Sequence, residues 1–145
     1  MENEPDIILT TANVNRGDTV PDGYINQFKK FEGIIEIFAI RDNPRMNANI
    51  PLCLETKSIG ECSKPRHEAL SEIPPWENTD GIPSNVTFAD LSEGFCDNET
   101  CYPVIGNIVI YRDQHHLTTL YVKTLASALE EHLEIVLEKV RMNNN

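Results

Sequence analysis

Four short apolar runs divide the chain, and each has the composition of a β-strand. The run 7–9, Ile-Ile-Leu, is rich in β-branched residues and predicts a buried strand that ends near Thr11. Residues 34–40, IIEIFAI, are apolar at successive positions, as in a parallel strand covered on both faces. Residues 85–89, NVTFA, predict a third strand, and residues 107–111, NIVIY, predict a last one.

Two other segments carry apolar residues at helical spacing. Residues 23–31 place Tyr, Ile and Phe side chains three or four positions apart, which predicts a short amphipathic helix ending at Gly33. Residues 117–140 repeat an apolar residue every three or four positions and predict one C-terminal helix of about six turns. Strands that alternate with helices predict an α/β domain with helices on both faces of a parallel sheet.

Residues 41–84 interrupt this alternation with a long segment that holds six of the chain's nine prolines. Only residues 65–72 have the composition of a short helix. Loops of such length are usually functional or cross-linked. Arg41, Asp42 and Arg45 follow the second strand, where they either line a cleft or pair with one another; we favour ion pairing.

Composition limits the classes of function. A chain of 145 residues suits one domain, and no apolar run approaches the ~18–20 residues that span a bilayer. The acidic start, MENEPD, lacks the basic and apolar parts of a secretion signal. The net charge is −11 and the longest basic run is Lys29-Lys30, which argues against nucleic acid and anionic membranes as partners.

Four cysteines form two close pairs, Cys53 with Cys62 and Cys96 with Cys101. Zinc ligands usually follow a C-x₂₋₄-C spacing, and only the second pair fits it. Disulfides in an oxidising compartment are the favoured interpretation, with free thiols and a metal site as alternatives. We expect the local pairing, Cys53–Cys62 and Cys96–Cys101, because short loops close most readily.

The run YRDQHHLTTLY, residues 111–121, is the candidate catalytic segment. Asp113 and His116 follow a predicted strand, at the edge where α/β sheets bind ligands. A catalytic histidine needs one ring nitrogen free and the other held by a carboxylate, and this spacing permits that arrangement. The alternative is that Thr118 or Thr119 caps the helix and the histidines are surface residues. The spacing is common, so it leaves both interpretations open.

A resemblance to a known family favours catalysis. YRDQHHLTTLYVKTLA, residues 111–126, resembles the last conserved block of the SGNH (GDSL-like) hydrolases, Asp-x-x-His-Leu-Ser/Thr followed by the C-terminal helix. Residues 6–14, 40–55 and 88–113 resemble, more narrowly, the SGNH domain at the C-terminus of bacterial acyltransferase-3 membrane proteins, which O-acetylate surface glycans. The resemblance spans residues 6–133.

The resemblance implies a three-layer αβα, flavodoxin-like sheet and a role for several residues. Asp113 and His116 would be the acid and base members of a Ser-His-Asp triad, and His115 falls on a variable position as a bystander. Asn13 falls on the asparagine that donates to the oxyanion hole, but the neighbouring family glycine and aspartate are absent. The alternative for Asn13 is a loop asparagine that bonds to its own turn.

The family's nucleophile lies in a Gly-Asp-Ser block, which this chain does not contain. Gly17-Asp18-Thr19 is the nearest string, and its position after the third block rules it out. We therefore expect residues 1–145 to be one partial SGNH domain, incomplete at its N-terminus and inactive alone. The nucleophile and a membrane acyltransferase module would lie upstream.

This interpretation carries further expectations about partners and location. The domain would act on a surface glycan at the extracytoplasmic face of the bacterial plasma membrane, without cofactor or metal. The absent first strand would leave an unpaired sheet edge through which two copies can dimerise. The alternative function is a non-catalytic, disulfide-stapled extracytoplasmic module that binds glycan or protein. A metal site built from Asp113, His115, His116 and cysteines is a third and remote alternative.

Overall fold

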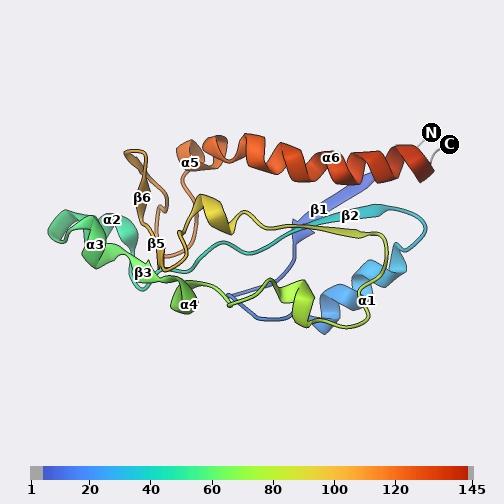
Figure 1. Ribbon diagram of the computed structural model, residues 1–145, viewed down its shortest axis with the longest axis horizontal. Helices are drawn as coiled ribbons and strands as arrows, with labels where there is room; N and C mark the ends of the chain where they lie inside the picture. The colour runs from blue at the N-terminus through green and yellow to red at the C-terminus, as the bar shows by residue number, and fades with distance from the viewer. Residues whose placement is uncertain (1–4, 144–145) are drawn as a thin grey trace.

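The central layer of the computed structural model, which describes residues 5–143, is a parallel sheet of three strands. The strands are β1 (Ile7–Thr11), β2 (Glu36–Ile40) and β4 (Val86–Ala89), and β2 lies between the other two. Figure 1 shows β1 and β2 between α6 above and α1 below. These are the first three predicted strands, so the predicted α/β fold with a parallel sheet between helices is confirmed.

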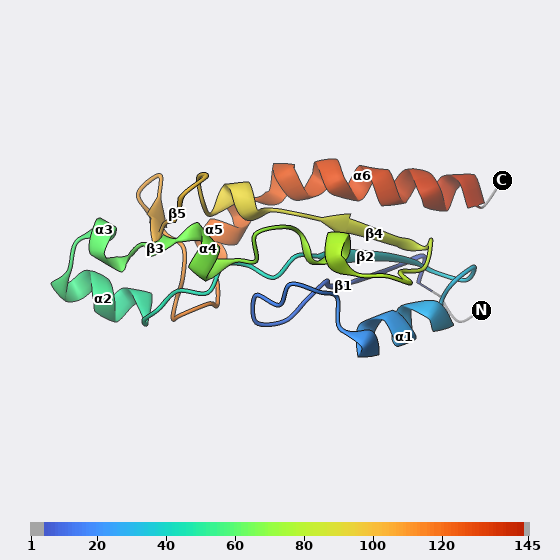
Figure 2. The same ribbon diagram turned by 60° about the horizontal axis from the view of Figure 1, so that its bottom comes forward.

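Two helices cover the sheet, one on each face (Figure 2). Helix α1 (Asp22–Lys30) packs on the face to which Ile37 points, and α6 (Ala126–Asn143) packs on the face to which Phe38 points. Consecutive residues of a strand face opposite sides, so the apolar run of β2 fills both cores. After α1 the chain turns at Gly33, whose φ of 75° is a left-handed conformation that favours glycine.

The segment 41–84 contains more regular structure than its proline content predicts. The helix expected within residues 65–72 is present as α4, but the other short helices were not predicted. Asparagine and serine caps begin two of them, because Asn49 accepts the amide hydrogen of Leu52 and Ser58 forms a capping box with Glu61. The elements of this segment are α2 (Ile50–Thr56), α3 (Ile59–Cys62), β3 (Lys64–Pro65), α4 (Arg66–Ala69) and η1 (Pro75–Asn78).

The last predicted strand does not join the parallel sheet, and that prediction was wrong. Its residues form β7 (Ile108–Val109), which pairs antiparallel with β6 (Val104–Ile105). The two residues between them, Gly106 and Asn107, have φ values of 56° and 62°. Two positive φ angles are typical of a type I′ turn, which closes a two-residue hairpin. The apolar run therefore folds onto its immediate neighbour.

The C-terminal helix is divided into α5 (Thr119–Thr124) and α6, where one continuous helix was predicted. The two helices pack on different surfaces. In α5 the Tyr121 hydroxyl donates to the carbonyl oxygen of Gly94, whereas α6 lies over β2 and β4 of the sheet. Both surfaces present apolar side chains, so the single apolar stripe in the sequence gave no sign of the division.

Both predicted disulfides are present, in a lobe beyond the sheet. Cys53–Cys62 joins α2 to α3. Cys96–Cys101 links the turn after η2 (Ser92–Gly94) to β5 (Thr100–Cys101), which pairs with β3. The second bridge is buried in an apolar core that this lobe shares with the end of the hairpin, and its members include Ile50, Phe95, Ile110, Tyr111 and Tyr121.

Replacing Val136 with alanine tests whether the packing of this one side chain of α6 on the sheet stabilises the fold. Val136 is fully buried against Phe38 and Ala89. We expect Val136→Ala to lower the free energy of unfolding by about 2 kcal/mol, because it leaves a cavity in this core. Urea denaturation measures the change. Ile135→Ala is the matched control, since Ile135 is 51% exposed, and we expect it to stay within about 0.5 kcal/mol of the wild type. Equal losses in both variants would contradict the packing described.

Candidate catalytic site

Asp113 and His116 are brought together by hydrogen bonds within one short loop. Asp113 Oδ2 lies 2.6 Å from His116 Nδ1. Its other oxygen, Oδ1, accepts the backbone N–H groups of His115 and His116, each at 2.8 Å. The backbone bonds from His115 and His116 and then the His116 ring hold the pKa of the Asp113 carboxyl well below its usual range. The carboxylate therefore stays ionised beside the imidazole.

This arrangement leaves the second ring nitrogen of His116 for chemistry. A carboxylate at Nδ1 fixes the imidazole so that Nε2 is the proton-accepting atom, and it stabilises the imidazolium once the proton arrives. The His116 side chain is 53% exposed, so the ring is accessible. No hydroxyl or thiol within residues 5–143 forms a hydrogen bond with the ring. The described residues thus hold a carboxylate–imidazole pair whose outer ring nitrogen has no hydroxyl or thiol partner among them.

The segment that follows β2 holds this loop in place. Asn43 Nδ2 donates to the carbonyl oxygen of His115 at 2.7 Å. Met46 N–H donates to the backbone carbonyl oxygen of Gln114 at 2.9 Å, and Ile50 N–H donates to the backbone carbonyl oxygen of Asp113 at 3.1 Å. The pair thus lies beyond the carboxyl end of β2, and a hairpin leads into its loop where a strand of the parallel sheet was expected.

Asn43 is a residue that the sequence interpretation missed. It is half-buried, and its amide links the end of the central strand to the Asp–His loop. Its position just after the predicted strand 34–40 was the available signal, since such positions reach the ligand-binding edge of an α/β sheet.

Arg41, the first residue after β2, connects the end of β4 to the chain near Ser71. Its guanidinium is buried, pairs with Asp90 at 2.7 Å and donates to the carbonyl oxygen of Ser71 at 2.7 Å. Burial raises the pKa of Asp90, but hydrogen bonds from Ser92 and Arg41 outweigh it, and the pKa lies below its usual value. The expected ion pairing is present, with a different distribution: Arg45 pairs with Asp42 at 3.5 Å, and Arg41 pairs with Asp90.

Asn13 is buried where β1 ends and bonds to two neighbouring backbone segments. Its Oδ1 accepts the N–H of Asp42 at 2.8 Å, and its Nδ2 donates to the carbonyl oxygen of Gly17 at 2.9 Å. These bonds are what the loop-asparagine alternative describes, and they leave one Nδ2 hydrogen uncommitted. A role for Asn13 in an oxyanion hole therefore stays a prediction.

Both interpretations of the 111–121 junction describe part of it. Thr118 caps α5: its Oγ1 accepts the N–H of Tyr121 at 3.3 Å and donates to the carbonyl oxygen of Val109 at 2.7 Å. The cap fixes the end of the loop that carries the Asp–His pair. Capping and pairing therefore coexist.

An apolar hollow of about 480 Å³ opens beside this loop. Its walls come from the end of β1, from Asn43 after β2 and from the start of the C-terminal helices. Leu9 of β1 contributes a side chain that is 61% exposed. The apolar lining residues are Leu9, Ile40, Leu91, Phe95, Leu117, Val122, Leu125 and Leu129. Asp113 and His116 do not line the hollow, which reaches the loop through Leu117 and through Asn43, the residue bonded to the His115 carbonyl oxygen.

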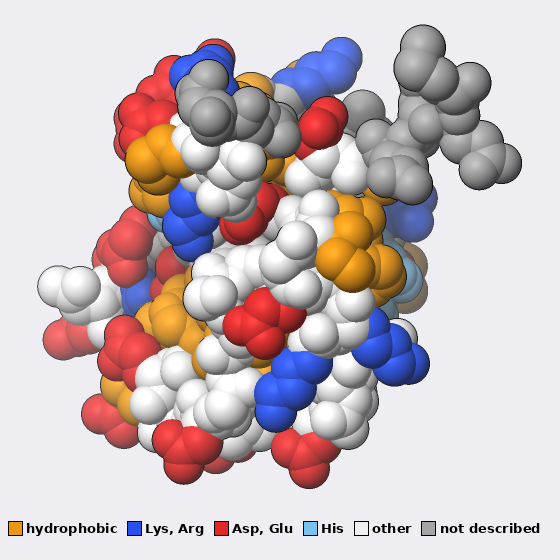
Figure 3. Space-filling view, turned by 90° about the vertical axis from the view of Figure 1, so that its right-hand side faces the viewer, with side chains coloured by type: hydrophobic (Ala, Val, Ile, Leu, Met, Phe, Trp, Pro, Cys, Tyr) orange, Lys and Arg blue, Asp and Glu red, His pale blue; other side chains and the backbone are white. Residues whose placement is uncertain are grey.

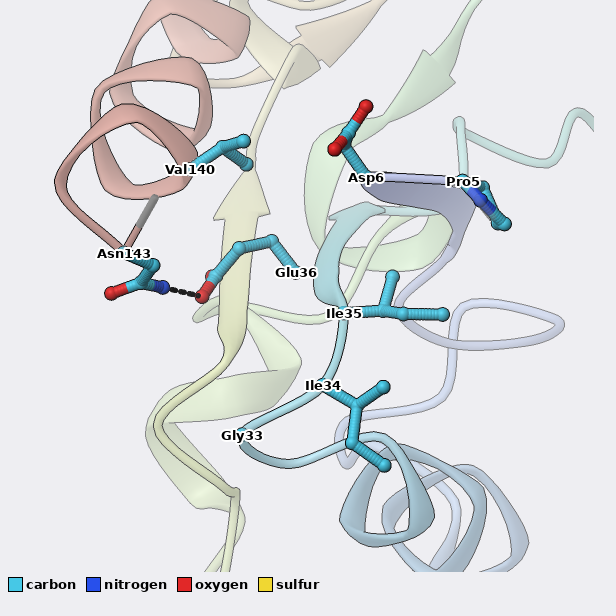
Figure 4. Close-up of a pocket in the computed structure, with 8 residues that line it drawn as sticks. All are labelled: Pro5, Asp6, Gly33, Ile34, Ile35, Glu36, Val140 and Asn143. Carbon is cyan, nitrogen blue, oxygen red and sulfur yellow. Dashed lines mark hydrogen bonds between the residues drawn. The ribbon is translucent and has the colours of Figure 1, made fainter. Parts of the chain in front are cut away.

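A second hollow, of about 550 Å³, lies at the opposite end of the sheet, and no histidine, serine or cysteine is among the residues that line it. Figure 4 shows that the Asp6 and Glu36 carboxylates point in different directions, and Glu36 accepts a hydrogen bond from Asn143 at 3.0 Å. On the face drawn in Figure 3, Lys and Arg side chains are dispersed among acidic ones. This face offers no basic patch for a nucleic acid.

Comparison with known families identifies the chain. A family model described as "SGNH domain (fused to AT3 domains)" matches residues 4–131. The chain belongs to this SGNH family. The match also gives the domain a membrane-protein context, since the AT3 domains to which the family is fused are acyltransferase membrane domains. No curated protein and no solved structure matches the chain. Within residues 5–143 of this SGNH domain, no helix is long and apolar enough to cross a membrane.

Replacing Asp113 tests the electrostatics of the loop. The folded-state pKa of Asp113 lies below its unfolded value of about 3.9. Its contribution to stability is therefore present above about pH 4 and is lost as the pH falls through the folded value. We expect Asp113→Asn to be less stable than wild type at pH 6 and to lose less stability between pH 6 and pH 3. Urea unfolding at both pH values measures this, and Glu134→Gln on α6 controls for net charge. Parallel pH profiles of wild type and Asp113→Asn would show that the loop bonds do not form in solution.

Replacing Asn43 tests whether it holds the Asp–His loop. Asn43→Ala removes the bond to His115, worth about 1 kcal/mol. We expect the His116 amide, which donates to Asp113, to exchange its hydrogen about fivefold faster, while the β2 amides exchange at the wild-type rate. Hydrogen exchange followed by NMR measures both. Asn98→Ala, at an exposed position in the disulfide loop, is the control and should leave His116 unchanged. Unaltered His116 exchange in Asn43→Ala would remove Asn43 from the site.

Proposed function

We propose that this SGNH domain supplies the acid–base pair of an acyl-transfer site that acts on esters of cell-surface glycans. Asp113 orients His116, and His116 activates a serine that another segment provides. The observation that carries the proposal is the 2.6 Å bond between Asp113 Oδ2 and His116 Nδ1, with the rest of the His116 ring exposed. Membership of a family fused to AT3 domains supports the acyltransferase setting.

The chemistry assigned to the pair is that of acyl-serine transfer. His116 Nε2 takes the proton of the serine hydroxyl as its oxygen attacks the ester carbonyl, and then gives that proton to the leaving alcohol. A second hydroxyl, from water or from a glycan, reverses these steps: His116 takes its proton and returns it to the serine oxygen as the acyl group leaves. The low pKa of Asp113 keeps its carboxylate ionised throughout, so it stabilises each imidazolium intermediate.

The open edge of β1 is the place where the segment carrying the serine would pair. Ala12 N–H donates to the backbone carbonyl oxygen of Ile40 at 2.7 Å, and Glu36 N–H donates to that of Asp6 at 3.3 Å. The even-numbered residues of β1 therefore bond to β2. In a parallel ladder the backbone groups of the alternate residues, Ile7, Leu9 and Thr11, then point away from the sheet's other strands. They offer N–H and C=O groups to one more strand. In the isolated chain the same groups could pair with a second copy, in line with the expected dimer.

The hollow beside β1 fits a helix that follows such a strand. Crossover connections between parallel strands are right-handed, and the β1–α1–β2 connection places α1 on the Ile37 face. A connection that leaves the added strand on the side away from β1 crosses the sheet in the opposite direction to the β1–β2 connection. The same right-handed rule then places its helix on the opposite face, beside α6. That is the side on which Leu9, Val122 and Leu129 line the hollow. A serine at the turn between that strand and helix would lie at the carboxyl edge, near His116.

The location and partners follow from the same proposal. Two disulfides support an oxidising, extracytoplasmic compartment. The partners are the remainder of the SGNH domain, a membrane acyltransferase module and a surface glycan. The alternative, a non-catalytic binding module, does not require the Asp113–His116 bond.

The experiment compares this chain with a longer protein that carries, ahead of residue 1, the serine-containing segment that the proposal requires. We expect the 145-residue chain to hydrolyse a chromogenic acetate ester no faster than buffer, and to resist labelling by a serine-reactive fluorophosphonate. We expect the longer protein to turn over the ester and to lose at least 10³-fold of kcat on His116→Ala. His67→Ala, at an exposed histidine outside the site, is the control and should retain activity.

Two results would contradict the proposal. Turnover by the 145-residue chain that His116→Ala abolishes would show that the nucleophile lies within this chain. Activity of the longer protein that survives His116→Ala would show that another group is the base, and the binding-module alternative would then apply to this chain.

A further inference from the structure

Three side chains that can bind metal ions lie together on the exposed side of the loop. Asp113, His115 and His116 each offer a ligand atom, and these atoms lie within 4.8 Å of one another. His115 Nδ1 is 3.9 Å from Asp113 Oδ1, and the centroids of the two imidazole rings are 4.1 Å apart. His115, which the family comparison at the sequence level leaves as a bystander, therefore lies next to both members of the acid–base pair.

We propose that Asp113, His115 and His116 form a binding site for a zinc-like dication and that its occupancy blocks the acid–base pair. The metal binding is inferred from the three side chains alone, whereas the inhibition assumes the proposed function. One carboxylate and two imidazoles are ligands that Zn²⁺ prefers, and three protein ligands with water at a fourth position are a common arrangement. All three side chains are partly or largely exposed, so the ion can reach them from solvent.

The loop is ordered before any ion arrives, which lowers the cost of binding. Asp113 Oδ1 holds the backbone of both histidines, and Arg112 N–H donates to the carbonyl oxygen of His116 at 2.9 Å. Asn43 fixes the His115 carbonyl from the side of the sheet. With the backbone fixed, the two imidazoles need only side-chain rotation to converge on one ion, and little conformational entropy is lost.

Occupancy removes the base by direct competition. Binding forms bonds from the ion to an Asp113 oxygen and to one ring nitrogen of each histidine. An ion that binds at His116 Nδ1 displaces the proton from that atom to Nε2, and an ion that binds at Nε2 occupies the proton-accepting atom itself. A metal-bound His116, no longer oriented by the carboxylate, cannot accept the proton of a serine. The same three residues would then switch the site between an active, metal-free form and a blocked form.

The binding part is tested on the 145-residue chain, without a nucleophile. Zinc chloride is titrated into chelator-treated protein by calorimetry, and the histidine ring signals are followed by NMR. We expect one ion per chain, with saturation below 1 mM and with the His115 and His116 signals shifted. We expect His115→Ala to weaken binding about tenfold or more, although it leaves the Asp113–His116 bond in place. His67→Ala is the matched control and should bind as wild type does.

Failure of the metal site and failure of the acid–base role give different results. No binding at 1 mM zinc, or equal binding by wild type and His115→Ala, would overturn the metal site. In the longer protein, zinc should inhibit the wild type at about tenfold lower concentration than it inhibits His115→Ala. Activity unaffected by saturating zinc would overturn the inhibition and leave the acid–base role intact. Zinc binding in a longer protein without esterase activity would instead refute the proposed function and leave the metal site standing.

Discussion

The Asp113 carboxylate has two tasks, and the candidate site depends on both. One oxygen accepts two backbone N–H groups and so gives the loop its shape. The other bonds to the ring that this shape brings within 2.6 Å. Each bond favours the ionised carboxylate, so the group that builds the loop is also kept charged beside the imidazole. Shape and electrostatics are therefore coupled in one side chain.

The loop that carries Asp113 and His116 is positioned by two parts of the molecule, which are stabilised in different ways. The sheet, with its two covering helices, is held by apolar packing around Ile37 and Phe38. The lobe beyond it is small and is reinforced by the two disulfides. The segment that follows β2 runs from one part into the other and donates three hydrogen bonds to the Asp–His loop. Asp113 and His116 therefore lie where the sheet and the disulfide-linked lobe meet.

The open edge of β1 gives the proposed function its physical basis. Among residues 5–143, β1 pairs with a strand on one side only, and its Leu9 is exposed. Such an edge promotes association between chains. The adjacent hollow adds apolar surface on the α6 side. An additional strand would pair with the edge of β1, and a helix following it would cover the apolar hollow.

The sequence by itself determined the elements whose signals are local. Apolar runs fixed β1, β2 and β4, cysteine spacing fixed the two bridges, and Asp-x-x-His with its flanking residues indicated the family and the pair at 113 and 116. The tertiary structure decided what depends on distant partners. It placed 107–111 in a hairpin, divided the last helix where its packing surface changes from Gly94 to the sheet, and bonded Asn43 to a loop 72 residues away. Periodicity records which face of a segment is apolar, but it does not record which surface that face will meet.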